Sequence, residues 1–79
     1  MKKHVKIYCD YFGHGEQSFI ACEVCGSVAV DIHHIVYRSQ LGKNNIENLM
    51  ALCRDHHNAA HSGKLTKEYL TKIHRKNLR

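Results

Sequence analysis

Apolar and polar residues alternate in two segments of the N-terminal half, and each segment predicts a β-strand. Residues 5–12 are rich in β-branched and aromatic side chains with partial alternation, and two glycines within residues 13–16 interrupt the pattern. Residues 28–36 alternate loosely and are rich in valine and isoleucine. The second strand would therefore carry the adjacent histidines His33 and His34.

The C-terminal half favours helices. Polar residues 37–45 predict a loop, and residues 46–52 predict a short helical turn or strand and then a second strand that leads into Cys53. Residues 54–62 predict a helix that Gly63 ends. A last helix is expected to begin at Thr66 with an apolar side and a Lys/Arg-rich side. The apolar side would hold Leu65, Tyr69, Leu70 and Ile73. Strands followed by helices indicate an α+β fold.

The length and charge of the chain indicate its domain number, its location and the kind of partner it could bind. A chain of 79 residues suits one domain, 1–79, whose small core commonly needs a disulfide, a metal or a partner for stability. No long apolar run follows the basic N-terminus, so we expect neither a signal peptide nor a membrane-spanning helix. We therefore expect the protein to be located in the reducing cytoplasm. The formal charge of +5 fits either a solvated basic surface or a nucleic-acid partner.

Two pairs of residues at x-x spacing predict a structural zinc site. Cys22 and Cys25 form a C-x-x-C, and Cys53 precedes His56 at the same spacing. Such pairs, one from each end of a loop, supply the four ligands of a tetrahedral zinc ion. The alternative is a set of buried free thiols beside an unrelated histidine. Cys9 lies outside the spacing and is expected to be a packed strand residue.

The remaining histidines predict a second metal site. On a helix, His57 and His61 share a face at i, i+4, and they point away from the zinc that His56 would bind. His33 and His34 could add a third ligand and a general base, since an imidazole pKa near ~6.5 suits proton transfer at neutral pH. In a regular strand these two side chains point to opposite faces. Both can serve one site only if the strand bends there, or if the base acts from the other side of the substrate. The alternative is that both are ordinary surface or packed histidines.

The order of these residues resembles that of the HNH endonucleases, the ββα-metal or His-Me finger nucleases, in the zinc-stapled form common in phages and bacterial restriction systems. The resemblance covers roughly residues 20–63, about half of the chain. It rests on the C-x-x-C pair, Asp31-Ile32-His33-His34-Ile35, Asn48-Leu49, and Leu52-Cys53-x-x-His56-His57 with His61. It implies a ββα-metal core with a treble-clef-like zinc knuckle and a C-terminal helix.

The resemblance also implies roles for individual residues. His34 would be the general base that activates water, and His33 would take the first metal-ligand position, which many relatives fill with aspartate. Asn48, otherwise readable as a turn or cap residue, would hold the loop that orients His34. His57 would bind the metal, and His61 matches a further ligand in the bacterial toxin branch. Cys22, Cys25, Cys53 and His56 match the zinc ligands, with His56 where a fourth cysteine is more usual.

Two further expectations concern the basic residues that could contact nucleic acid and the identity of the catalytic cation. Guanidinium and ammonium groups match phosphate, although each such residue is equally readable as a solvated cation. The candidates for nucleic-acid contact are Arg38, Lys43, Arg54, Lys72 and Arg75, and Lys2, Lys3 and Lys6 could touch the same backbone. Three imidazole ligands favour Mn, Ni, Co or Zn over Mg, although relatives often work with Mg or Mn.

The sequence thus predicts a metal-dependent endonuclease that hydrolyses double-stranded DNA with water as nucleophile, and the resemblance implies products with a 5′-phosphate and a 3′-hydroxyl. Its sequence specificity should be weak, because no separate recognition domain is present. Two other interpretations stay open. One is a non-catalytic zinc-binding DNA or protein adaptor, and the other is a nuclease active only within a phage terminase or restriction complex.

Overall fold

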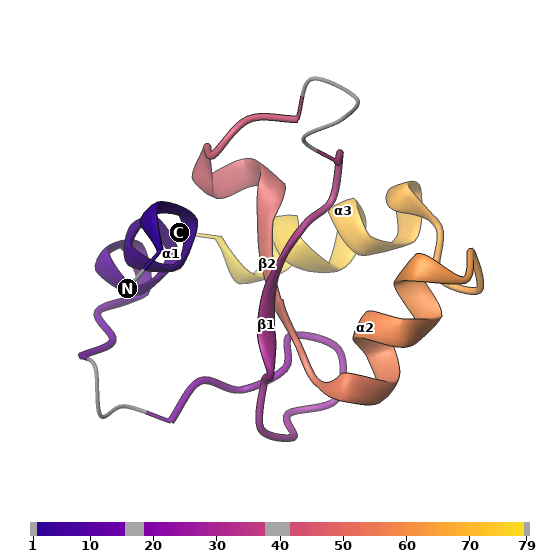
Figure 1. Cartoon of the computed structure of the whole chain (residues 1–79), viewed down its shortest axis with the longest axis horizontal. Coiled ribbons are helices and arrows are strands. Elements are labelled where there is room, and N and C mark those ends of the chain that lie inside the picture. The colour runs from indigo at the N-terminus through magenta and orange to yellow at the C-terminus, as the bar shows by residue number, and fades with distance from the viewer. Residues whose placement is uncertain (1, 16–18, 38–41, 79) are drawn as a thin grey trace.

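The computed structural model describes residues 2–15, 19–37 and 42–78 of the chain. A helix is followed by a strand, a short 3-10 turn, a second strand and two further helices (Figure 1). Their bounds are α1 Lys3–Phe12, β1 Asp31–His34, η2 Ile46–Asn48, β2 Leu49–Leu52, α2 Arg54–His61 and α3 Lys67–Asn77. The expected α+β class is confirmed.

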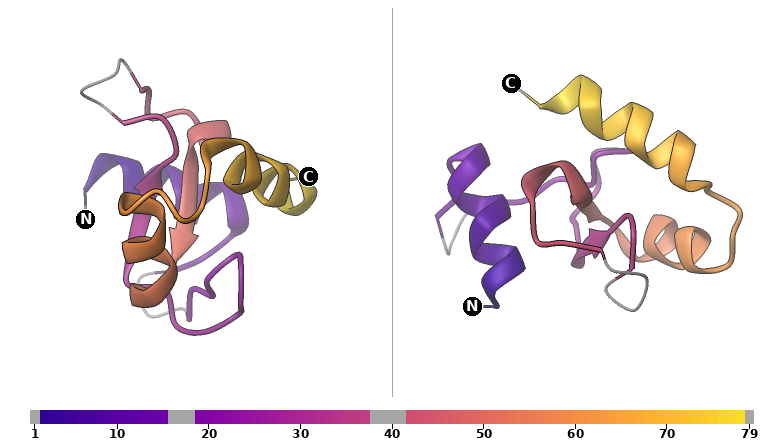
Figure 2. Two further views of the ribbon diagram at one scale, coloured as in Figure 1. Left: turned by 90° about the vertical axis from the view of Figure 1, so that its right-hand side faces the viewer. Right: turned by 90° about the horizontal axis from the view of Figure 1, so that it is seen from above.

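The two strands form a small antiparallel sheet at the centre of the molecule. β1 pairs with β2 so that His33 lies opposite Met50 and His34 opposite Leu49. Every residue of β2 is fully buried, because helices cover both faces of the strand (Figures 1 and 2). Met50 and Leu52 pack with residues of α2 and α3, whereas Leu49 and Ala51 pack with Tyr8 of α1.

The prediction of a strand over residues 5–12 was wrong, because α1 occupies this segment. The apolar residues Val5, Tyr8, Cys9 and Phe12 recur at i, i+3, i+4 and i+7, which is the helical period. Tyr8 and Cys9 are buried, and Tyr8 packs against Ile32, Leu49 and Ala51 of the sheet. Cys9 is packed as expected, but on a helix. Gly13 ends α1 with a left-handed backbone of φ 75°, a conformation that glycine adopts without steric cost.

The strand expected over residues 28–36 is shorter in the structure, where β1 spans four residues. Val28 instead forms an isolated bridge with Ala21 on the other side of the C-x-x-C turn. Val30 still donates its N–H to the carbonyl of Leu52, so the chain runs alongside β2 before β1 begins. The first residues of the expected strand therefore belong to the turn between Ala21 and Val28 and not to β1.

The C-terminal elements agree with the predictions except on one helix face. A short turn precedes β2 as one of the two expected alternatives, and α2 ends at His61, shortly before Gly63. Thr66 caps α3, because its hydroxyl accepts the N–H of Tyr69 at 3.1 Å. Of the residues predicted on the apolar side of this helix, Leu70 is buried but Tyr69 is 46% exposed, and the polar residue His74 is buried as well. No helix among the described residues is long and apolar enough to cross a membrane.

A buried carboxylate connects these elements. Glu23 Oε2 accepts the hydroxyl of Tyr8 at 2.7 Å and the N–H of Ala51 at 3.2 Å. Its Oε1 accepts His74 Nδ1 at 2.7 Å and Asn77 Nδ2 at 3.1 Å. Burial alone would raise the pKa of Glu23, but the hydrogen bonds from His74, Asn77 and Tyr8 outweigh it and lower the pKa.

His74 is the charged partner of this carboxylate. Its Nε2 donates to the carbonyl of Ile46 at 2.6 Å while its Nδ1 donates to Glu23, so both ring nitrogens carry protons. Burial alone would lower the pKa of His74, but the hydrogen bond to Glu23 raises it. The side chains of the pair are 1% and 5% exposed, so this is a buried ion pair.

We expect Glu23→Gln to destabilise the protein by about 3 kcal/mol or more, because it leaves the imidazolium of His74 buried without its counter-charge. The measurement is urea unfolding followed by circular dichroism on zinc-saturated protein. Asp10→Asn is the control, since it removes the carboxylate of the exposed Lys6–Asp10 pair and should leave the unfolding midpoint unchanged. Equal midpoints for wild type and Glu23→Gln would contradict the role assigned to this pair.

Candidate metal centres and active-site cleft

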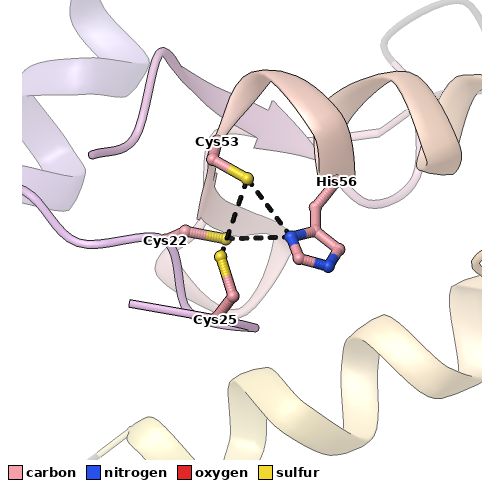
Figure 3. Close-up of side chains that lie close together, drawn as sticks. All are labelled: Cys22, Cys25, Cys53 and His56. Atoms are coloured by element: carbon pink, nitrogen blue, oxygen red, sulfur yellow. Dashed lines mark hydrogen bonds between the residues drawn. The ribbon is translucent and has the colours of Figure 1, made fainter. Parts of the chain in front are cut away.

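Four potential ligands from two distant segments come together at the start of α2. Cys22, Cys25, Cys53 and His56 each offer one ligand atom, and these atoms all lie within 4.8 Å of one another (Figure 3). The sulfurs of Cys25 and Cys53 are 3.7 Å apart, and Nδ1 of His56 lies 3.7 Å from the sulfur of Cys22. The two x-x pairs therefore converge as their spacing predicted.

Local backbone structure positions each pair. Between Cys22 and Cys25 the chain turns tightly, with the N–H of Gly26 donating to the carbonyl of Cys22 at 2.9 Å. Gly26 has φ 83°, which a side chain would strain. Cys53 is the N-cap of α2, and His56 lies in the first turn of that helix, so both side chains face the same point.

The donor set fits zinc. Two sulfurs at ~2.3 Å from a tetrahedral ion lie about 3.8 Å apart, close to the spacing of Cys25 and Cys53. Hydrogen bonds from the side chain and backbone of Ser27 lower the pKa of Cys25 to about 6, which favours the thiolate that a metal requires. These residues are thus compatible with a structural zinc site.

A second cluster lies on the other side of α2. Ligand atoms of His33, His57 and His61 all lie within 4.8 Å of one another. His57 and His61, one turn apart on the helix, bring their Nε2 atoms to 3.0 Å. Nitrogens ~2.1 Å from a shared ion are about 3.0 Å apart at a right angle and about 3.4 Å apart at the tetrahedral angle, so this spacing fits joint coordination.

The protonation state of His33 favours metal binding. Burial, together with the charges of His57 and His61, lowers the pKa of His33 to about 4, so this ring is neutral at physiological pH. A neutral imidazole has the free nitrogen lone pair that a cation needs. Asp31, two residues before His33, brings its carboxylate to 3.4 Å from Nε2 of His57 and adds an oxygen donor at the rim.

Tyr37 covers the cluster from the loop that follows β1. Its ring stacks on His61 at 5.5 Å between centroids and meets His33 edge-on at 5.8 Å. Its hydroxyl lies 3.3 Å from Nδ1 of His61. This contact occupies the nitrogen of His61 that faces away from His57, as outer-shell hydrogen bonds commonly do for metal-binding histidines.

His34 lies on the opposite face of β1, as strand geometry requires. Its ring packs against His4 of α1 at 4.8 Å, and its Nε2 lies 2.7 Å from Oδ1 of Asn44. His33 and His34 nevertheless line one open cavity of about 600 Å³, because the cavity extends across β1 from α1 to α2. Its other lining residues are Lys2, Lys3, His4, Asp31, Ile32, Tyr37, Asn44, His57 and His61.

Asn48 fastens the loop between the two strands. Its Oδ1 accepts the N–H of Val36 at 2.7 Å, and its Nδ2 donates to the carbonyls of Val36 at 3.0 Å and Lys43 at 2.9 Å. One amide thus joins the start and the end of the loop. Gly42 is packed so closely against the backbone of Val36 that a Cβ there would collide with it. Asn48 thus connects residues 36 and 43 across the loop that follows His34, and its role in orienting His34 stays a prediction.

The expected nucleic-acid residues are dispersed. Arg38 lies outside the described residues. Lys43 and Arg54 are exposed, and Lys72 and Arg75 border a separate hollow on α3. None of these four described residues lines the cavity that holds His34.

Sequence reasoning gave no site role to Asn44 or Tyr37, and it gave Lys2 and Lys3 only a general one. The helical spacing of the apolar residues in α1 was the signal that could have located the two lysines. The N-terminal end of that helix brings both of them to the cavity.

We expect the protein to retain one tightly bound zinc ion at Cys22, Cys25, Cys53 and His56, and to unfold when a strong chelator removes it. Cys25→Ser should lower the zinc content after gel filtration, measured with a colorimetric indicator, and lower the helical circular dichroism signal. Cys9→Ala is the matched control, because Cys9 is buried but belongs to neither cluster. Equal zinc loss from both variants, or native structure without zinc, would contradict the assignment.

The comparison with known proteins agrees with this geometry. No curated protein and no solved structure matches the chain. A sequence model of the family described as HNH endonuclease matches residues 22–63, which is more than half of the 79 residues and contains both clusters. The chain therefore belongs to the HNH endonuclease family, whose members are generally metal-dependent nucleases.

Proposed function

We propose that this protein is a metal-dependent endonuclease that hydrolyses phosphodiester bonds of double-stranded DNA. The observation that carries the proposal is the shared cavity: three imidazoles spaced to bind one ion line it on one side of β1, and His34 lines it on the other. A zinc adaptor without catalytic function has no need of this second cluster. Membership of the HNH family supports the same activity.

In the proposed reaction, His34 removes a proton from the water that attacks the phosphorus. His33, His57 and His61 would hold the cation, with Asp31 at its edge. When bound, that cation supplies electrostatic stabilisation for the negative charge that develops on the phosphate and the leaving oxygen. No covalent intermediate forms, and we infer products with a 5′-phosphate and a 3′-hydroxyl.

Basic side chains would hold the DNA across the cavity. Lys2 and Lys3 line it on the side of α1, close to His34, and would contact phosphates next to the cleaved bond. We propose that Lys43, Arg54, Lys72 and Arg75 contact phosphates farther away, where they add affinity without base recognition. The formal charge of +5 is consistent with this role.

The cellular setting is part of the proposal. A reducing cytoplasm keeps the three cysteine ligands as thiols that zinc can bind. The protein would act either alone or as the nuclease of a phage packaging or bacterial restriction complex. Strong cleavage by the isolated chain would favour independent action.

We predict that purified wild-type protein nicks supercoiled plasmid in the presence of a divalent cation and that EDTA abolishes the reaction. His34→Ala should lower the rate by about 10²–10⁴-fold, because the water loses its general base. Nicked and linear products are measured on agarose gels over time.

His14→Ala is the control, because His14 packs near Tyr8 and Phe12 outside the cavity and its loss should leave the rate unchanged. Folding and zinc content are measured for each variant. Folded, zinc-loaded wild type that cleaves in no metal would favour the adaptor or a nuclease that requires a partner.

We also predict that Mn²⁺ or Ni²⁺ supports faster cleavage than Mg²⁺, because three imidazole ligands favour borderline cations and Mg²⁺ prefers oxygen. Initial rates at matched, saturating metal concentrations test this order. His61→Ala should reduce the advantage of Ni²⁺ over Mg²⁺, since it removes one imidazole. An equal or higher rate with Mg²⁺ in wild type would show that the three histidines do not act together as ligands.

A further inference from the structure

The side chain of Asn44 is in direct contact with the proposed general base. Its Oδ1 lies 2.7 Å from Nε2 of His34, and both residues line the cavity. An amide oxygen has lone pairs and no proton, so it can only accept a hydrogen bond. The contact therefore requires a proton on Nε2 of His34.

We propose that Asn44 is a positioning residue that fixes the tautomer and the ring orientation of His34, and this inference rests on the function proposed above. With the proton on Nε2, the neutral ring has its only lone pair on Nδ1. Nδ1 is then the atom that takes the proton from water. Asn44 does not touch the substrate in this role and acts through His34.

The loop is built to hold Asn44 in place. Asn48 donates to the carbonyl of Lys43 at 2.9 Å, which fixes the residue immediately before Asn44. The N–H of Asn48 donates to the carbonyl of Asn45 at 2.8 Å, which fixes the residue immediately after it. Asn48 thus acts on His34 through Asn44, which gives the middle residue of the motif a physical link to the base.

A second contact supports the ring of His34 from α1. The ring of His4 lies 4.8 Å from it at an interplanar angle of 45°. This packing limits how far the ring can tilt, whereas it does not decide which nitrogen carries the proton. Among the described residues, the hydrogen bond to Asn44 is the contact that selects the tautomer. Without it, water would solvate Nε2, and the ring could rotate or change tautomer.

Kinetics on a fluorescent DNA duplex test this role. Asn44→Ala should lower kcat about 10–100-fold with KM changed less than about twofold. Losses of this size are typical when a hydrogen bond that orients a metal-binding histidine is removed, and we expect a similar effect for an oriented base. Asn44→Asp should restore kcat to within about fivefold of wild type, because a carboxylate oxygen also accepts a hydrogen bond from Nε2–H of His34.

The matched control for this series is Asn45→Ala. Asn45 is the neighbouring asparagine, and its side chain does not cap the turn η2. This variant should match wild type. The proposal is overturned if Asn44→Ala and Asn45→Ala have equal kcat, or if Asn44→Ala raises only KM.

Nitrogen-15 NMR of the imidazole rings gives a readout that does not depend on cleavage. At a pH where His34 is neutral, its Nε2 should carry the proton in wild type, and that proton should be visible because the hydrogen bond slows its exchange. It should disappear in Asn44→Ala and return in Asn44→Asp. His34→Ala assigns the signal among the eight histidines.

A proton on Nδ1 of His34 in wild type would overturn the proposal. So would an Nε2 proton that stays equally visible in Asn44→Ala. If wild type does not cleave DNA, the proposed function fails, and the NMR experiment still decides whether Asn44 sets the tautomer. The two ideas can therefore fail separately.

Discussion

The structure depends on the burial of one carboxylate. Glu23 is almost inaccessible to solvent, and a buried charge is tolerated only when hydrogen bonds and an opposite charge compensate for lost hydration. The compensating donors come from α1, β2 and α3, so these elements must all be docked at once for the carboxylate to be satisfied. Glu23 also lies between Cys22 and Cys25. The cluster of four candidate zinc ligands and the ion pair therefore share this turn, which helps a chain of this size to hold a single structure.

This network continues to the cavity that His33 and His34 line. His74 donates one ring N–H to the carboxylate of Glu23 and the other to the carbonyl of Ile46, the first residue of η2. The same turn ends at Asn48, whose amide closes the loop beside His34. A path of hydrogen bonds thus joins the C-x-x-C turn and α3 to the loop beside His34. Precise placement of catalytic groups requires such support, because displacements of about 1 Å are costly to rate.

The features that the sequence predicted well depend on short separations along the chain. Pairs at x-x spacing and the i, i+4 histidines of α2 are set by local geometry, so Cys22, Cys25, His57 and His61 converge as expected. The features that it missed depend on tertiary contacts. Residues 5–12 fit two periods, and only packing against the sheet decides for a helix. Glu23 and His74 are 51 residues apart, and nothing in either local sequence indicates that they meet. Asn44 likewise resembles any polar loop residue in the sequence, and only the folded loop, which Asn48 holds, brings it next to His34.

Adjacent histidines on a strand should serve opposite faces, yet His33 and His34 line one cavity. The small size of the sheet resolves this conflict. Among the described residues β1 pairs with β2 alone, so its other edge is not covered by a third strand. Side chains from both faces can then approach a substrate that lies across that edge, with the three-histidine cluster on one side and His34 on the other. A central strand in a larger sheet could not do this, because its neighbours would separate the two faces. The two-stranded sheet is therefore what allows the proposed chemistry: consecutive residues could provide a metal ligand and a base from opposite faces of β1.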